Sequence, residues 1–369
     1  MENKSSKKPL FHIVKIDDIS GPREWAIRAA AIIAALLLCA VITTILTGDN
    51  PIEIYKTIIE GAFGSQRKTW ITLQNISILL IISLALTPAF KMQFWNIGGE
   101  GQVLIGGLAA AACMICIGDS LPNYLVIIIM TVSSIAAGAI WGLIPAFFKA
   151  KLNTNETLST LMMNYIAIQL VAYYTIVWEV PKGSGKIGII NQNTSAGWLP
   201  NVGNKYLLPI IVAALITAFI YIYLKYTKQG YEIAVVGQSQ NTAVYVGIKV
   251  EKVIIRTMIL SGALCGLAGL LLVGGINHTI TTTIADGQGF TGVMVSWLAK
   301  FNPIAMVATS FLIILMDRGA GEISTAFGLN QSFADILTGI LLFFIIGCEF
   351  FLRYRISFTS DKKERRESK

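Results

Sequence analysis

The sequence predicts an all-α membrane protein that crosses the bilayer about ten times. Of its 369 residues, 54% are hydrophobic and 14% are charged, whereas a soluble domain usually carries about 25% charged residues. The polar stretches reach only roughly 25 residues, which is too short to bury a separate core. We therefore expect a basic cytosolic segment over 1–24, a transmembrane domain over 25–352 and a basic cytosolic tail over 353–369.

Ten apolar segments support this prediction. They are 25–47, 71–90, 94–117, 123–147, 157–178, 206–225, 253–276, 288–300, 303–317 and 332–352. The first is as long as a spanning helix, and the polar residues before it contain no apolar run of the kind found in signal peptides. The eighth and ninth span only roughly 20 Å each at 1.5 Å per residue. Their shortness predicts a pair of half-helices or a re-entrant hairpin.

The distribution of Lys and Arg predicts the orientation. With the N-terminus inside, 22 of these residues lie on the cytosolic side and 7 on the outer side. Lys and Arg are enriched in cytosolic loops, so both termini are expected in the cytosol of a multi-pass protein. The basic tail is then a topology signal that faces anionic lipid, and not a nucleic-acid site.

The predicted directions of the segments indicate inverted-repeat halves. Segments two to five begin outside, whereas segments seven to ten begin inside, as in inverted repeats. Glu100-Gly101-Gln102 opens the third segment, and Asp286-Gly287-Gln288 opens the eighth, which is its counterpart.

A polar cluster lies between two apolar runs. Asn96, Glu100 and Gln102 are accompanied there by three glycines. Burying such groups in hydrocarbon is costly unless they face protein or water. They either line a pathway or gate, or cap the third segment, where a carboxylate suits the positive end of the helix dipole. The predicted topology places the cluster toward the cytosol, which favours a gate over an outer substrate site.

Further pathway candidates lie within the spans. Asn75 and Asn164 are intramembrane amides that must face the pathway or a partner helix. Trp297 could stack on a planar ligand, although anchoring at the membrane interface is the commoner role of tryptophan.

The longest inner loop, 228–252, is too apolar for a plain loop. Asn241 can cap a short helix whose apolar face includes Ala243, Val244 and Val246. Such a helix could be gripped by a docking partner or could lie in the lipid interface. The residues that we assign to docking are Gly230, Gly237, Gln238, Asn241, Ala243, Tyr245 and Gly247.

No catalytic or metal site is expected. The chain has 2 histidines and 5 cysteines, and no second pair completes the C-x-x-C of Cys113 and Cys116. The outer loop 179–205 contains Gly183-Ser184-Gly185-Lys186, which lacks the first glycine and the final hydroxyl residue of a phosphate-binding loop. We expect no cofactor and no ATPase site of its own, so that any ATP-driven work would need another subunit.

Four stretches resemble one family of permeases. Residues 96–102 (N-I-G-G-E-G-Q) are similar to the N-I-G-x-E-G-Q signature of permeases in bacterial ATP-binding-cassette (ABC) importers for branched-chain amino acids, simple sugars and nucleosides. Residues 230–248 and 289–303 resemble that family's cytosolic loop and its G-F…N-P stretch, while 155–167 most resembles the nucleoside branch. Ala234 departs from the pattern, since the family loop usually has Arg there.

The resemblance implies a type II importer fold of about ten helices that forms the translocation pathway for nucleosides in the bacterial cell membrane. It also implies three partners. These are a cytosolic ATP-binding subunit docked on the 230–248 loop, a second permease that is often a different chain, and an extracytoplasmic substrate-binding lipoprotein.

Other functions stay open. Simple sugars are the alternative substrate. An ion-coupled secondary transporter would keep inverted repeats and usually needs a buried acid; Glu100, Asp317 and Asp335 qualify only as residues near segment ends. An intramembrane hydrolase is disfavoured by the scarce histidines and by the lack of a G-x-S-x-G motif.

Overall fold

The computed structural model describes residues 11–15, 21–48, 50–328, ten residues within 332–347, and 354–358. In this part of the chain, seven helical stretches are long and apolar enough to cross a membrane. They are Gln66–Lys91, Gly99–Ile117, Asn123–Leu152, Glu156–Trp178, Leu207–Tyr226, Val250–Asn277 and Pro303–Ala326. A shorter apolar stretch, Ala29–Ile45, lies within α1 (Gly21–Thr47). The prediction of a multi-pass helical membrane protein is confirmed, although most of the tenth segment lies outside the described residues.

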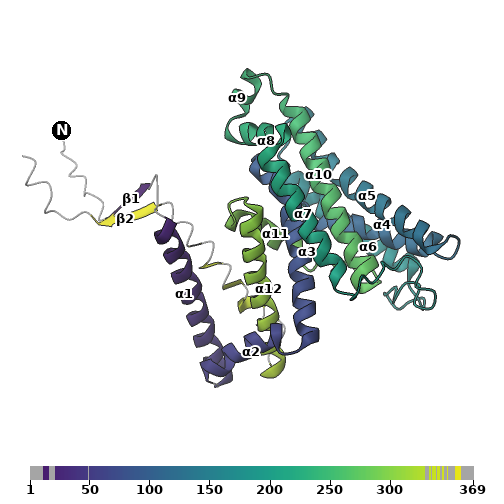
Figure 1. The fold of residues 1–369 in the computed structure, drawn as a ribbon, viewed down its shortest axis with the longest axis horizontal. Coiled ribbons are helices and arrows are strands. Elements are labelled where there is room, and N and C mark those ends of the chain that lie inside the picture. Colours follow the sequence, from purple (N-terminus) through teal and green to yellow (C-terminus); the bar gives the residue numbers. More distant parts are fainter. Residues whose placement is uncertain are drawn as a thin grey trace, which may run out of the picture. The chain divides into compact units, whose positions relative to one another are not determined.

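The chain divides into two compact units. The larger unit, 63–314, contains most of the predicted spans (Figure 1). Its helices are α3 (Gln66–Lys91), α4 (Gly99–Ile117), α5 (Asn123–Leu152), α6 (Glu156–Trp178), α7 (Leu207–Tyr226), α8 (Lys228–Gln238), α9 (Gln240–Tyr245), α10 (Val250–Leu270), the π-helix η1 (Leu271–Asn277), α11 (Gln288–Leu298) and the first half of α12 (Pro303–Ala326).

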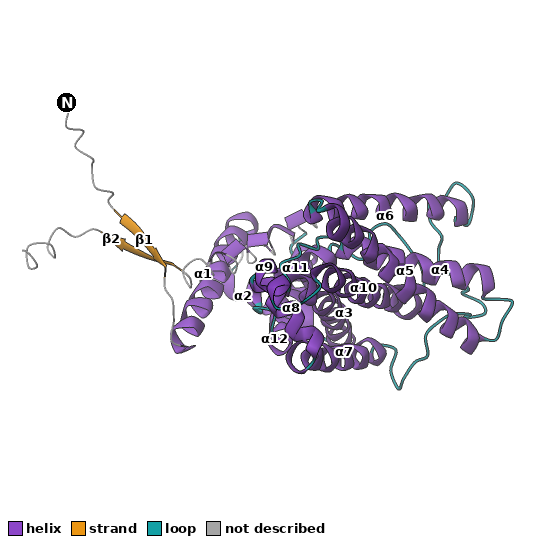
Figure 2. Cartoon of the chain, turned by 90° about the horizontal axis from the view of Figure 1, so that it is seen from above, coloured by secondary structure: helices purple, strands orange, loops and turns teal. Residues whose placement is uncertain are grey.

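Helix α10 is the centre of the larger unit. It packs against α3, α4 and α5, and Figure 2 shows α10 among these helices in the view from above. Gly138 of α5 faces Gly262 of α10 so closely that a Cβ on either would collide with the backbone of the other helix. Small residues at such a crossing let two helix backbones approach and gain van der Waals contact, which is the main source of helix association in lipid.

The contacts between the predicted inverted halves match only in part. In the sequence, α3 and α4 are the counterparts of α10 and α11. In the structure, α3 packs against α11 and α4 packs against α10. These two contacts are equivalent under an inverted repeat. The close packing of α5 on α10, however, has no comparable counterpart between α3 and α12 among the described residues, so the inverted halves stay a prediction.

The predicted pair of short helices at 288–300 and 303–317 is only half right. Helix α11 has 11 residues, too few to span the bilayer, but α12 continues to Ala326 and has 24. The apolar run ends at Asp317 and Arg318, but the helix continues past both residues. Both predicted alternatives, a pair of half-helices and a re-entrant hairpin, required two short helices and are therefore wrong for α12, while α11 alone has the length of a half-helix.

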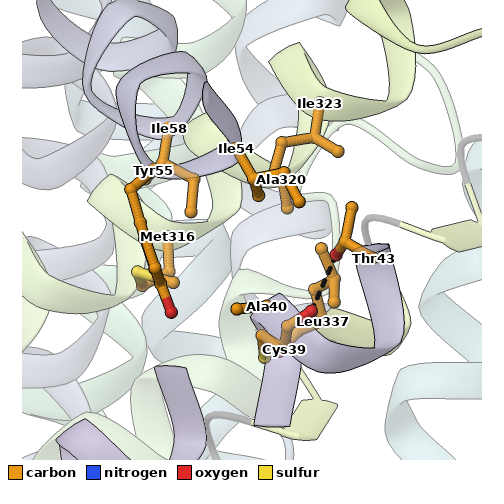
Figure 3. Close-up of a pocket in the computed structure, with 10 residues that line it drawn as sticks. All are labelled: Cys39, Ala40, Thr43, Ile54, Tyr55, Ile58, Met316, Ala320, Ile323 and Leu337. Atoms are coloured by element: carbon orange, nitrogen blue, oxygen red, sulfur yellow. Dashed lines mark hydrogen bonds between the residues drawn. The ribbon is translucent and has the colours of Figure 1, made fainter. Parts of the chain in front are cut away.

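The smaller unit comprises 1–62 and 315–369. Within it, α1 and α2 (Pro51–Phe63) pack with the second half of α12 around a space of only about 10 Å³, beside which the Thr43 hydroxyl donates to the Cys39 carbonyl at 2.8 Å (Figure 3). That volume is about the size of one water, so it is a packing gap and not a ligand pocket. The sequence prediction had missed α2, which it treated as part of a loop.

Two short strands join the ends of the chain in this unit. Strand β1 (Phe11–Lys15) pairs antiparallel with β2 (Tyr354–Phe358), with Phe11 opposite Phe358. These strands are the exception to the all-α prediction among the described residues. Their pairing brings the residues before the first helix beside those near the C-terminus.

Candidate functional site

The polar turn before α4 is buried. Asn96 is 0% exposed, and its Oδ1 accepts from the Gly98 N–H at 3.0 Å, which shapes the turn into the helix. Its Nδ2 donates to Ser261 Oγ of α10 at 3.2 Å, while Gln102 Nε2 donates back to Asn96 Oδ1 at 3.3 Å. Asn96 and Gln102 thus fasten the start of α4 to α10, and their polar atoms point into protein.

Glu100 caps a helix far away in the chain. Its Oε1 accepts from the Gly287 N–H at 3.1 Å and its Oε2 from the Gly289 N–H at 2.8 Å. Gly287 is the N-cap residue of α11, with φ +69° and no side-chain capping bond of its own. A carboxylate on these orphan N–H groups satisfies them and suits the positive end of the α11 dipole. Glu100 is a cap, as one alternative held, but of the eighth predicted segment and not of its own helix.

This contact joins the two counterpart motifs. Glu100-Gly101-Gln102 and Asp286-Gly287-Gln288 meet at the starts of α4 and α11. Gly289 follows the second motif, and a Cβ there would collide with the Glu100 backbone. Only glycine permits this close approach, so the two helix starts are held together by shape as well as by charge.

Asn164 of α6 holds the same turn from the other side. Its Nδ2 donates to the Ile97 carbonyl at 2.9 Å and its Oδ1 accepts from the Gly101 N–H at 2.8 Å. Thr160, one helical turn earlier, accepts from the Ile97 N–H at 3.3 Å. The structure therefore supports helix-to-helix bonding for Asn164. Thr160 was not predicted, although its i, i+4 spacing from Asn164 places both on one helix face.

The other two pathway candidates are Asn75 and Trp297. Asn75 is half-buried in α3 and has a polar interaction. Trp297 of α11 is 38% exposed and stacks on Trp95, with ring centroids 5.3 Å apart, while Phe90 meets it edge-on. Trp297 lies near the C-terminal end of α11 and is part of an aromatic cluster beside the polar turn, because Trp95 directly precedes Asn96.

An irregular segment leads to the start of α11. Residues 278–287 follow η1 without forming a helix, and Thr281, Thr283 and Asp286 are exposed there. The segment ends at Gly287, which donates to Glu100. The turn before Glu100 is bonded to Asn164, which lies about 12 Å along α6 from the first residue of that helix. The threonines were not singled out from the sequence, although three consecutive ones, 281–283, lie in the polar stretch between two apolar segments.

The long inner loop forms two helices beside the start of α10 (Figure 1). Thr227 caps α8 by accepting from the Gly230 N–H at 3.1 Å, and Ser239 caps α9 by accepting from the Thr242 N–H at 3.2 Å. The prediction that Asn241 caps the helix is wrong. Ser239 has extended backbone, which places its hydroxyl over the first turn of α9, whereas Asn241 is already inside the helix.

The docking candidates divide into buried anchors and exposed residues. Gly230 packs against the end of α7 and Gly237 against the end of α3, so closely that neither site has room for a Cβ. Ala243 is 0% exposed, which corrects its assignment to an outer apolar face. Gln238, Asn241 and Gly247 are exposed.

The apolar side chains exposed at α9 and at its end are Val244 (63% exposed), Tyr245 (91%) and Val246 (56%), which we call the α9 tip. Tyr231 of α8 is exposed as well (64%). Because Ala243 packs inward, the α9 tip supplies the large apolar side chains that a partner could contact at this helix.

The outer loop after α6 is ordered by a second carboxylate. Glu179 accepts from the Gly183 N–H at 2.7 Å and from the Gly185 N–H at 2.8 Å. These two bonds hold the pKa of the Glu179 carboxyl below its usual range. Further along, Asn191 Nδ2 donates to the Met114 carbonyl at 2.7 Å, which ties the loop to α4.

A membrane-spanning bundle that contains a half-helix, α11, approached by an irregular polar segment has features of a transport permease. A family model described as "Branched-chain amino acid transport system / permease component" matches residues 70–346, and the chain belongs to this family. The sequence-based recognition of an ABC importer permease is thereby confirmed.

Three curated relatives illustrate the range of substrates. The chain is 29% identical to the guanosine ABC transporter permease protein NupP of Bacillus subtilis, over 85% of this chain and 91% of the relative. It is 27% identical to the nucleoside ABC transporter permease protein NupB of Lactococcus lactis, over 88% and 91%. It is 25% identical to the glucose ABC transporter permease protein TsgB13 of Haloferax volcanii, over 90% of each chain. Permeases named for nucleosides and for glucose thus match at comparable identity.

Proposed function

We propose that this permease forms the transmembrane pathway of an ABC importer for nucleosides. The similarity to NupP and NupB supports this substrate, together with the nucleoside-like stretch 155–167. A simple sugar is the second candidate, and the match to TsgB13 favours it. The chain itself carries out no bond chemistry, and ATP is hydrolysed on separate subunits.

The pathway runs along the irregular segment 278–287 to the Glu100 contact. Non-helical backbone at membrane depth is tolerated only where it is covered by protein or lines a water-filled space. Exposed Thr281, Thr283 and Asp286 are polar, so they face water and not lipid. The single observation that carries the pathway proposal is this exposed polar segment ending at a helix start that Glu100 holds. Glu100 and α11 then form the gate.

The α9 tip docks the cytosolic ATP-binding subunit. Its exposed apolar side chains stand on a loop whose glycines are packed against α3 and α7, so force on the tip is passed to membrane helices. ATP-driven closure must favour one conformation of the permease over another through such a contact. A second permease and an extracytoplasmic binding protein complete the importer. Both termini lie in the cytosol, and the pairing of β1 with β2 supports a common side.

The substrate is tested with the intact importer, purified through a tag on this chain and reconstituted in proteoliposomes. ATP is enclosed in the vesicle lumen, which corresponds to the cytosol. We expect ATP-dependent uptake of radiolabelled guanosine or uridine that excess unlabelled nucleoside suppresses and excess glucose does not. Uptake of glucose that nucleosides leave unchanged would replace the nucleoside proposal with the sugar one.

The docking role of the tip is tested with Val244→Asp and Tyr245→Ser. Both side chains are exposed, so we expect unchanged membrane insertion and thermal stability but loss of co-purifying ATP-binding subunit or of coupled ATP hydrolysis. Gln229→Asp, an exposed change in the first turn of α8, is the control. Normal uptake by both tip variants would contradict the assignment. Ala243→Asp is unsuitable because it buries a charge and destabilises α9.

A further inference from the structure

A groove lies beside the α9 tip at the start of α10. Its volume is about 510 Å³, and α8 forms one wall while 246–256 form the other. Its lining contains four cationic side chains, Lys228, Lys249, Lys252 and Arg256, and a single carboxylate, Glu232. We call it the lysine groove.

The charges in the groove do not balance. Arg256 Nη2 donates to Glu232 Oε2 at 2.5 Å, so these two charges neutralise each other. The nearest acid of the first α10 turn, Glu251, pairs with Lys151 on α5. The three groove lysines are exposed and remain as excess positive charge. No side chain caps the α10 N-terminus, whose dipole adds to the positive potential.

The lysine groove is continuous with the α9 tip. Val246 belongs to the tip and also lines the groove, together with Gly247. A protein seated on Val244 and Tyr245 would therefore cover the mouth of the groove. A partner that binds this apolar surface would be complementary to the excess positive charge if it carried anionic groups beside its own apolar contacts. Such groups would steer the association of the two proteins and fix their relative orientation.

We propose that the lysine groove receives carboxylate side chains of the ATP-binding subunit. This inference rests on the proposed function and adds the chemistry of the partner's contact surface. The apolar tip supplies contact area, and the groove supplies orientation through Lys228, Lys249 and Lys252. It also gives this chain a source of positive charge at the loop, where Ala234 replaces the Arg that is usual in the family.

A zero-length cross-linker tests the contact directly. A carbodiimide joins a lysine amine to a carboxylate only when the two touch, so it is applied to the intact importer and the peptides are read by mass spectrometry. We expect links from Lys249 or Lys252 to Asp or Glu of the ATP-binding subunit. Lys225, exposed at the end of α7 outside the groove, is the control and should give none. An ATP-binding subunit that co-purifies but never links to the groove lysines overturns this inference and leaves the proposed function standing.

Charge removal gives an independent measurement. Single changes Lys249→Gln and Lys252→Gln should each weaken binding of the ATP-binding subunit about two- to fivefold at low salt, with the effect fading above roughly 0.5 M salt. Lys249→Arg, which keeps the charge, should restore binding, and Lys225→Gln should change nothing. If instead the variants bind the subunit normally but lose retention of phosphatidylglycerol relative to Lys225→Gln, the groove holds a lipid headgroup and the inference is wrong. If no ATP-binding subunit co-purifies with the unaltered chain, the proposed function itself fails.

Discussion

Replacing Glu100 by Ala should release the start of α11. The carboxylate accepts two backbone N–H bonds, at 3.1 and 2.8 Å, and the side chain is 6% exposed. Hydrogen bonds to a charged group contribute about 1.5–3 kcal/mol each. Losing both bonds would lower the free energy of locally opening the start of α11 by about 3 kcal/mol or more. The equilibrium constant for opening would then rise by about two orders of magnitude. Glu100→Gln retains one acceptor oxygen, and we expect roughly a tenfold effect from it.

Hydrogen exchange of the Gly287 and Gly289 amides measures this opening in detergent or nanodiscs. We expect exchange to accelerate about 100-fold in Glu100→Ala and about 10-fold in Glu100→Gln. Glu251→Gln, which breaks an exposed ion pair, should leave both amides unchanged. If both amides in Glu100→Ala exchange as in the unaltered protein, Glu100 does not hold α11 and the gate proposal loses its basis. Membrane insertion should stay intact while uptake falls, because the change acts on one helix start.

Three further changes test other parts of the structure. Asn164→Leu removes two hydrogen bonds to the turn before α4 and should lower stability by about 2–4 kcal/mol, whereas Gln169→Leu, exposed on the same helix, should have little effect on the detergent melting temperature. Gly262→Leu should cost about 3 kcal/mol or prevent assembly, since it forces α10 away from α5; a normal melt would contradict that close crossing. Glu179→Gln should loosen the outer loop at pH 7. Because the folded pKa of Glu179 is depressed, its contribution is complete above the ordinary carboxyl pKa of about 4.3 and is lost as pH falls through the lower folded value. Melting curves of variant and unaltered protein should therefore differ at pH 7 and converge at the acid end; a constant difference would refute the linkage.

Much of the fold was predictable because a bilayer restricts the choices of a chain. Backbone polar groups in hydrocarbon must be satisfied within helices, so apolar length translates directly into spans. The predicted segments between 71 and 276 all correspond to helices of the structure. The importance of 96–102 was equally visible, since polar residues are expensive in that solvent.

Sequence rules for helix caps, apolar faces and helix ends failed where packing against other residues decided the local structure. Asn241 has the chemistry of a cap, but the backbone of Ser239 put that residue at the start of α9 instead. Ala243 fitted an apolar face, and only its packing showed that it faces inward. Asp317 and Arg318 ended an apolar run without ending a helix, because a charged side chain does not by itself stop one.

The sequence by itself determined that this chain is a multi-pass membrane protein and where most of its spans lie, since composition and apolar length are properties of a linear string. Its motifs indicated the permease family, and its polar interruptions singled out Glu100 and Asn164 as candidates. The tertiary structure alone decided what those residues hold. Glu100 reaches Gly287 and Gly289, and Asn164 reaches Ile97 and Gly101. These partners are between 63 and 189 positions away along the chain. No helical periodicity extends over such separations, so only the packing of whole helices could choose them.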